Sequence, residues 1–286
     1  MKTQHNDTRL RDKIAIVLTL IMSILLTVSS FLISIRATVF VEGFVFKQLE
    51  DIDYVYLVQD YFMEVVTSRA VLYGVDVTYL SDAFTTEKMK EDIFRSTRML
   101  FDGQRPDFFV EELSDDLKEH LIAYVDDQGM TLTVEVEAGI DELTGKLVND
   151  YTRIMQVPLF RNYVEAKNQF GRIFWWAIAG LSVLIGVIVT LILRLYKHRH
   201  RALRLLSHGT SAVGLMSLIV LVPIYLSKAY QRIQISPRFF NLLLAETIES
   251  ALLISILIAL SWFVASFFLI EGSERSRKKA FKKNPN

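Results

Sequence analysis

The sequence predicts an all-α membrane protein with four transmembrane helices and a helical extracytoplasmic domain between the first and the second. Hydrophobic residues make up 51% and aromatic residues 12% of the 286 residues, more than a soluble chain of this length usually carries. Four windows contain no charged side chain: 14–35, 173–193, 209–227 and 250–270. At about 1.5 Å per residue, each is about 28 to 33 Å long and can cross a hydrocarbon core of about 30 Å.

The distribution of charge predicts the orientation. Lys and Arg gather in residues 1–13, 194–208 and 271–286, and cytoplasmic segments carry such an excess of basic residues. Between residues 37 and 171 the chain has 26 acidic and 12 basic residues. We therefore expect a multi-pass protein of the cell membrane with both termini in the cytoplasm. Residues 36–172 form its extracytoplasmic domain, and residues 228–249 form a short outer loop and the start of a helix.

The stretch "YKHRHRALRLLSHG" is predicted to be a cytoplasmic loop that its charges hold on the inner side. His198 and His200 are two residues apart, which places them on different faces of a helix, and no Cys or acid is near to complete a metal site. With Tyr196 as its only aromatic residue, the loop is too short for nucleic-acid binding. The basic loop and tail instead supply candidate contacts to anionic lipids: Lys197, Arg199, Arg201, Arg204, Arg277, Lys278, Lys279, Lys282 and Lys283.

The first apolar window is predicted to be an uncleaved anchor. Its 22 residues exceed the core of about 7 to 15 residues that a signal peptide has, and no clear small-x-small cleavage site follows. The chain has no cysteine, so a domain outside the cell would be held together by packing without disulfides.

The extracytoplasmic domain is predicted to begin as one long helix that continues the first span up to Gly74. Apolar residues recur every three or four positions, as on the packed face of a coiled coil. They are Val41, Val45, Leu49, Ile52, Tyr56, Met63, Val66 and Ala70. Gln59 interrupts this series with a polar side chain.

Shorter amphipathic helices are predicted to follow. One begins at Thr85 or Thr86 and ends at Asp102–Gly103, and the next runs from about Asp107 to Val125. Residues 131–139 alternate like a strand, but no partner strand is present, so we favour a helix with a short strand as the alternative. After Pro158 a last helix continues into the second span, whose Trp175 and Trp176 are predicted interface anchors.

The outer end of the second hairpin carries a candidate ion-pair cluster. The stretch "ISPRFF" predicts a helix start, with Ser236 as the cap and Pro237 in the first turn. Glu246 and Glu249 then lie on one helix face, with Lys228 and Arg232 as basic partners from the adjoining span. This cluster is either a structural clasp or a proton or cation site.

Three segments around the four spans carry a resemblance: "VLYGVDVTYLSDAF", "KHRHRALRLLSHGTSAVGLM" and "QRIQISPRFFNLLLAETIESAL". They resemble an uncharacterised family of four-span membrane proteins from Gram-positive bacteria. The resemblance implies this topology with an outward helical domain, and it implies no activity and no functional residue.

The sequence favours a non-enzymatic function. The outward region has one histidine, His120, and no HExxH, GxxxxGK[ST], GxGxxG or GxSxG motif occurs. No catalytic, cofactor-binding or metal-binding residue is expected. We favour an accessory or sensory subunit whose outward domain binds a ligand or another membrane protein. The alternative is an oligomeric transporter or channel component, while an intramembrane enzyme lacks candidate residues.

Small residues at Ser182 with Gly186, and at Gly209 with Gly214, predict either self-association or ordinary packing between the spans.

Overall fold

The computed structural model describes residues 2–104, 106, 108, 110–156, 160–196, 199–233 and 235–283, with the side chains of residues 2–9, 160, 161 and 279–283 outside that description. The all-α fold class is confirmed, because these residues form helices and no strand. In chain order they are α1 (Lys2–Ala37), α2 (Glu42–Asp51), α3 (Tyr54–Tyr73), α4 (Thr78–Ser81), α5 (Thr86–Phe101), α6 (Val110–Asp127), α7 (Val134–Met155), α8 (Phe160–Leu195), α9 (Arg199–Ser227), the 3-10 helix η1 (Ala229–Arg232) and α10 (Arg238–Lys283).

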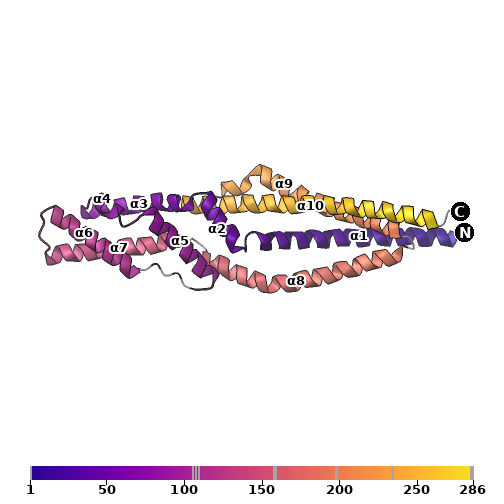
Figure 1. The fold of residues 1–286 in the computed structure, drawn as a ribbon, viewed down its shortest axis with the longest axis horizontal. Helices are drawn as coiled ribbons and strands as arrows, with labels where there is room; N and C mark the ends of the chain where they lie inside the picture. The colour runs from indigo at the N-terminus through magenta and orange to yellow at the C-terminus, as the bar shows by residue number, and fades with distance from the viewer. Residues whose placement is uncertain are drawn as a thin grey trace. The chain divides into compact units, whose positions relative to one another are not determined.

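Four helices are long and apolar enough to cross a membrane. The candidate spans are Leu10–Ala37, Asn162–Leu195, Arg199–Ser227 and Arg238–Lys278. Each contains one of the four uncharged windows, so the number of spans agrees with the sequence. Figure 1 shows α8 and α10 as long uninterrupted helices, and α8 confirms that the last helix before the second window continues into it.

The chain divides into two compact units. The first, called here the four-helix unit, comprises Met1–Val41, Gln169–Ile233 and Thr247–Asn286. The second, called here the helical domain, comprises Glu42–Asn168 and Gln234–Glu246. The sequence assigned residues 234–246 to an outer loop and the start of a helix, and did not anticipate that they belong to the domain.

In the four-helix unit, α1 and α9 pack closely around Gly209. A Cβ atom at this position would lie 2.6 Å from Met22 Cε and 2.8 Å from Thr19 Cγ2. The Ser23 hydroxyl also donates a hydrogen bond to the Gly209 carbonyl at 2.9 Å. Gly209 therefore serves ordinary packing within the unit, whereas Gly186 of α8 has no atom within 4 Å of a Cβ placed there.

Side-chain hydroxyls join α10 to its neighbours. Trp262 Nε1 donates to Ser30 Oγ of α1 at 2.8 Å. Towards the other end of α10, the hydroxyls of Ser266 and Ser273 donate to backbone carbonyls of α9, at Ser207 and His200 respectively. Polar side chains join helices in this way inside membranes, where no water competes for the hydrogen bond.

The helical domain has one hydrophobic core. It is formed mainly by α3, α5, α6 and α7, which lie together in Figure 1. Phe62, Leu117 and Leu147 are completely buried in it. The first turns of α10 contribute Phe239, Phe240 and Leu243 to the same core, and α8 contributes Val164. Two candidate spans therefore begin inside the core of the domain.

The predicted cap and end of α5 are confirmed. Thr85 caps α5 by accepting a hydrogen bond from the Lys88 backbone, and Gly103 follows the helix with a φ of 76°. Thr133 caps α7, so residues 131–139 are helical from Val134 onward. The helix predicted from Asp107 begins at Val110 in the structure, and Asp107 itself lies outside the described residues.

The single long helix predicted from the first span to Gly74 is wrong. The chain turns between α1 and α2, and Asp53, with a φ of 50°, separates α2 from α3. Because the second break rotates the following helix, Tyr56 is 62% exposed and Val55 and Val58 are buried instead. Gln59, which broke the apolar series, donates to the Phe84 carbonyl at 3.1 Å and so holds the chain before α5.

The boundaries of three other segments also differ from the sequence prediction. Residues 194–208 were expected to be a loop, but α9 begins at Arg199, and residues 271–283 continue α10. At the outer hairpin, α10 begins at Arg238, so Pro237 precedes the helix, and its carbonyl accepts from the Asn241 backbone at 3.3 Å.

Candidate functional site

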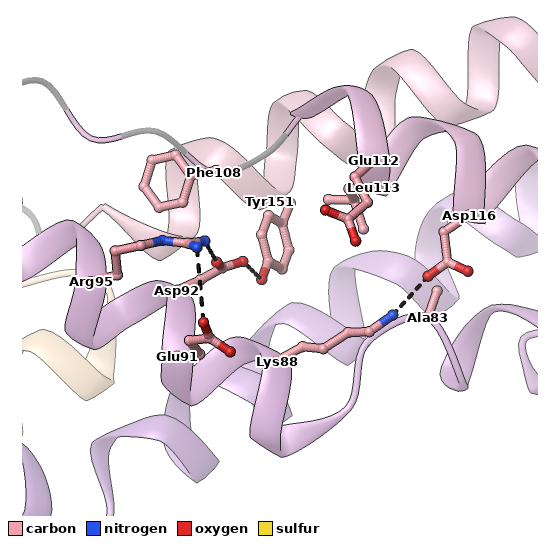
Figure 2. Close-up of a pocket in the computed structure, with 10 residues that line it drawn as sticks. All are labelled: Ala83, Lys88, Glu91, Asp92, Arg95, Phe108, Glu112, Leu113, Asp116 and Tyr151. Atoms are coloured by element: carbon pink, nitrogen blue, oxygen red, sulfur yellow. Dashed lines mark hydrogen bonds and ion pairs between the residues drawn. The ribbon is translucent and has the colours of Figure 1, made fainter.

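One concave site in the described part of the chain is a cleft between α5 and α6, called here the α5–α6 cleft. Its volume is about 190 Å³. Figure 2 shows its ten lining residues: Ala83, Lys88, Glu91, Asp92, Arg95, Phe108, Glu112, Leu113, Asp116 and Tyr151. Six of the ten carry a formal charge, so the cleft differs sharply from the apolar core beneath it.

The floor of the cleft is a hydrogen-bonded triad. The hydroxyl of Tyr151, from α7, donates to Asp92 Oδ2 at 2.6 Å, and the Arg95 guanidinium pairs with the other oxygen of the same carboxylate. The Tyr151 ring packs edge-on against Phe62 and is 2% exposed. The triad thus connects the cleft to the core, because the same tyrosine belongs to both.

Burial changes the acid–base behaviour of this floor. Desolvation raises the pKa of Asp92 above its ordinary value of 3.8, although the hydrogen bond from Tyr151 and the charge of Arg95 both act in the opposite direction. Desolvation also raises the pKa of Tyr151, and its hydrogen bond to Asp92 adds to the effect. Tyr151 therefore stays a neutral donor at physiological pH.

The rim of the cleft carries charges from both helices. Lys88 Nζ of α5 lies 2.9 Å from Asp116 Oδ2 of α6 and bridges the opening, as Figure 2 shows. Glu91 is 75% exposed and lies 3.9 Å from the Arg95 guanidinium. Glu112, from α6, also lines the cleft. The lining therefore holds four carboxylates and two basic side chains, and its net charge is negative.

The polar groups on the floor of the cleft are paired with one another. The Asp92 carboxylate is held by two donors, and the raised pKa of Tyr151 keeps its hydroxyl protonated as one of them. Among the described residues, no three His, Cys, Asp or Glu side chains are placed to hold a metal ion. His120, on α6, lies 3.6 Å from Asp116 and outside the cleft lining. The cleft offers polar and charged contacts beside apolar ones from Phe108 and Leu113.

Sequence reasoning did not find this cleft. Asp92 and Arg95 lie three residues apart on α5, a spacing that allows an ion pair on one helix face but is common on solvated helices. Tyr151 follows Leu147 by four residues, an apolar spacing that indicates no polar partner from α5. Only the packing of α5 against α7 brings the three side chains together.

The structure distributes the predicted ion-pair cluster over both units. Glu246 belongs to the helical domain, whereas Lys228, Arg232 and Glu249 belong to the four-helix unit. Glu249 Oε2 accepts hydrogen bonds from the Tyr230 hydroxyl at 3.0 Å and from the side-chain amide of Gln231 at 3.4 Å. The ion pairs of Glu249 with Lys228 and Arg232 stay a prediction.

The predicted lipid contacts lie at helix ends. Arg199, Arg201 and Arg204 are in the first turns of α9, and Arg277 and Lys278 are exposed near the end of α10. Lys197 lies outside the described residues, and the side chains of Lys279, Lys282 and Lys283 are not described either.

No protein-family model, curated protein or solved structure matches this chain.

Proposed function

We propose that this chain is a non-enzymatic integral membrane protein of the bacterial cell envelope. In this proposal it is an accessory or sensory subunit whose helical domain faces outward and binds a partner or ligand at the α5–α6 cleft. The acidic composition of the domain and the basic flanks of the spans support this orientation.

One observation carries the proposal: α8 and α10 contribute side chains to the core of the domain and then continue, without a break, as candidate spans. Tyr151 belongs to that core and to the floor of the cleft. Binding at the cleft therefore acts on the same packed core from which two spans begin. A soluble binding domain tethered by flexible linkers would lack this connection.

Photo-crosslinking in intact cells tests the binding part of the proposal. A benzophenone amino acid replaces Glu112 at the cleft, and a matched variant carries it at Glu64, an exposed acid on α3. We expect a defined adduct from position 112 that position 64 does not give. Lys88→Glu should abolish this adduct, because it removes the bridge to Asp116 and reverses a charge of the lining.

Two outcomes contradict the proposal. Equal adduct patterns from both positions would show that the cleft has no partner of its own. An adduct that persists unchanged in the Lys88→Glu variant would show that the contact does not depend on the cleft.

A further inference from the structure

One face of α9 changes its chemical character along its length. Arg201, Arg204 and His208 are exposed, and their spacing of three and four residues places them on the same side of the helix. Leu215 and Ile219 continue that side, with 55% and 64% of their surface exposed. We call these five residues the α9 lipid face. It is basic over about two turns and then apolar.

The basic end of this face has uncompensated charge. In the four-helix unit, Asp12 pairs with Arg11 at 3.5 Å and Glu271 pairs with Arg275 at 2.5 Å. Within the described part of the chain, the structure gives neither Arg201 nor Arg204 an acidic partner. Both guanidinium groups are therefore available to an anion from outside the protein.

The dimensions of the face match those of a phospholipid. The uncharged window of α9 begins at Gly209, directly after His208. From Arg204 to Leu215 the helix rises by about 16 Å, close to the depth of one leaflet in a hydrocarbon core of about 30 Å. A phosphate at the arginines would thus place an acyl chain along Leu215 and Ile219.

We propose that the α9 lipid face binds one anionic phospholipid, with its phosphate at Arg201 and Arg204 and an acyl chain along Leu215 and Ile219. A guanidinium group binds phosphate oxygens through two parallel hydrogen bonds, which makes arginine suited to this contact. A headgroup with a net negative charge is favoured over a zwitterionic one, whose own cation would face the same arginines. This site goes beyond the proposed function and does not depend on the α5–α6 cleft.

Native mass spectrometry of the full chain tests this site. The protein is purified in a neutral detergent, stripped of lipid and titrated with phosphatidylglycerol, with phosphatidylcholine or with inorganic phosphate. We expect one tightly bound phosphatidylglycerol and weaker binding of phosphatidylcholine. Arg201→Gln with Arg204→Gln should weaken phosphatidylglycerol binding by about 25-fold, or about 5-fold for each charge removed.

A charge-matched control separates this face from the basic surface as a whole. Lys13→Gln with Arg194→Gln removes the same charge from exposed positions on α1 and α8 and should leave the tight site intact. Equal losses in both double variants would overturn the proposal, as would equal affinity for the two lipids. Displacement of phosphatidylglycerol by millimolar inorganic phosphate would show a phosphate site rather than a lipid site. Because all four substituted side chains are exposed, unchanged tryptophan emission should confirm that the variants fold.

Discussion

Replacing Phe239 with alanine tests whether the first turn of α10 belongs to the core of the helical domain. Phe239 is 3% exposed, and the centre of its ring lies 5.6 Å from the centre of the Tyr54 ring and 5.5 Å from that of the Tyr61 ring. Truncating a buried phenylalanine to alanine costs about 3 to 5 kcal/mol, from lost burial and from the cavity that remains. With an m-value of about 2 kcal/mol per molar urea, the unfolding midpoint of the domain should fall by about 1.5 to 2.5 M.

Pulse proteolysis in urea measures this change in the full-length protein in detergent. The three tryptophans, Trp175, Trp176 and Trp262, all lie in the four-helix unit, so their emission without urea reports whether that unit is still folded in the variant. Phe267→Ala is the matched control, since it removes the same ring from the same helix at a position that is 63% exposed and outside the domain. An unchanged midpoint in Phe239→Ala would refute the assignment of α10 to the domain core.

Three further predictions concern the cleft, the orientation and the packing of the spans. Because burial raises the pKa of Asp92, the urea midpoint of the wild-type domain should fall as pH rises from 3.8 through that raised pKa. In Asp92→Asn the fall in urea midpoint between about pH 4 and about pH 7 should be smaller, and an equal fall would contradict a stabilising role of the protonated Asp92. On intact cells, Gln128→Cys should react with an impermeant maleimide while Arg277→Cys should not, and the reverse pattern would invert the topology. Gly209→Ala should destabilise the four-helix unit by about 1 to 3 kcal/mol through overpacking, whereas Gly186→Ala, with open space around it, should not; thermal melts that fail to separate the two variants would argue against this packing.

The sequence could predict the features that depend on neighbouring residues. An uncharged window of about 20 residues is a local property, and all four windows lie in long apolar helices. Caps are local as well: a threonine at the start of α5 and a glycine after its end were sufficient to place that helix.

The break between α2 and α3 could not be predicted in the same way. Apolar spacing continues through Ile52 and Tyr56 as it would in one helix, and Asp53 adopts a left-handed conformation that few residues other than glycine adopt readily. What favours the break is the burial of Tyr54, Val55 and Val58 in the domain core. That burial depends on helices distant in the sequence, so the local pattern does not contain it.

The contribution of α10 to the domain core could not be predicted from the local sequence either. Phe239, Phe240 and Leu243 stand before an apolar window, where such residues ordinarily extend a span or meet the membrane interface. Their partners, such as Tyr54 and Tyr61, are more than 170 residues away in the chain. Without those partners, the sequence offers no reason to assign the three residues to a domain core.

The contacts of α10 within the four-helix unit restrict its rotation. Within the four-helix unit this helix is positioned by directional hydrogen bonds at several levels, among them Ser255 with Ser34, Trp262 with Ser30 and Ser266 with the Ser207 carbonyl. Each such bond contributes about 0.6 to 2 kcal/mol in a membrane and tolerates little rotation of the helix about its axis. A rotation of α10 about its axis would therefore break these bonds together, including the bond from Ser266 to α9 two residues before Gly209.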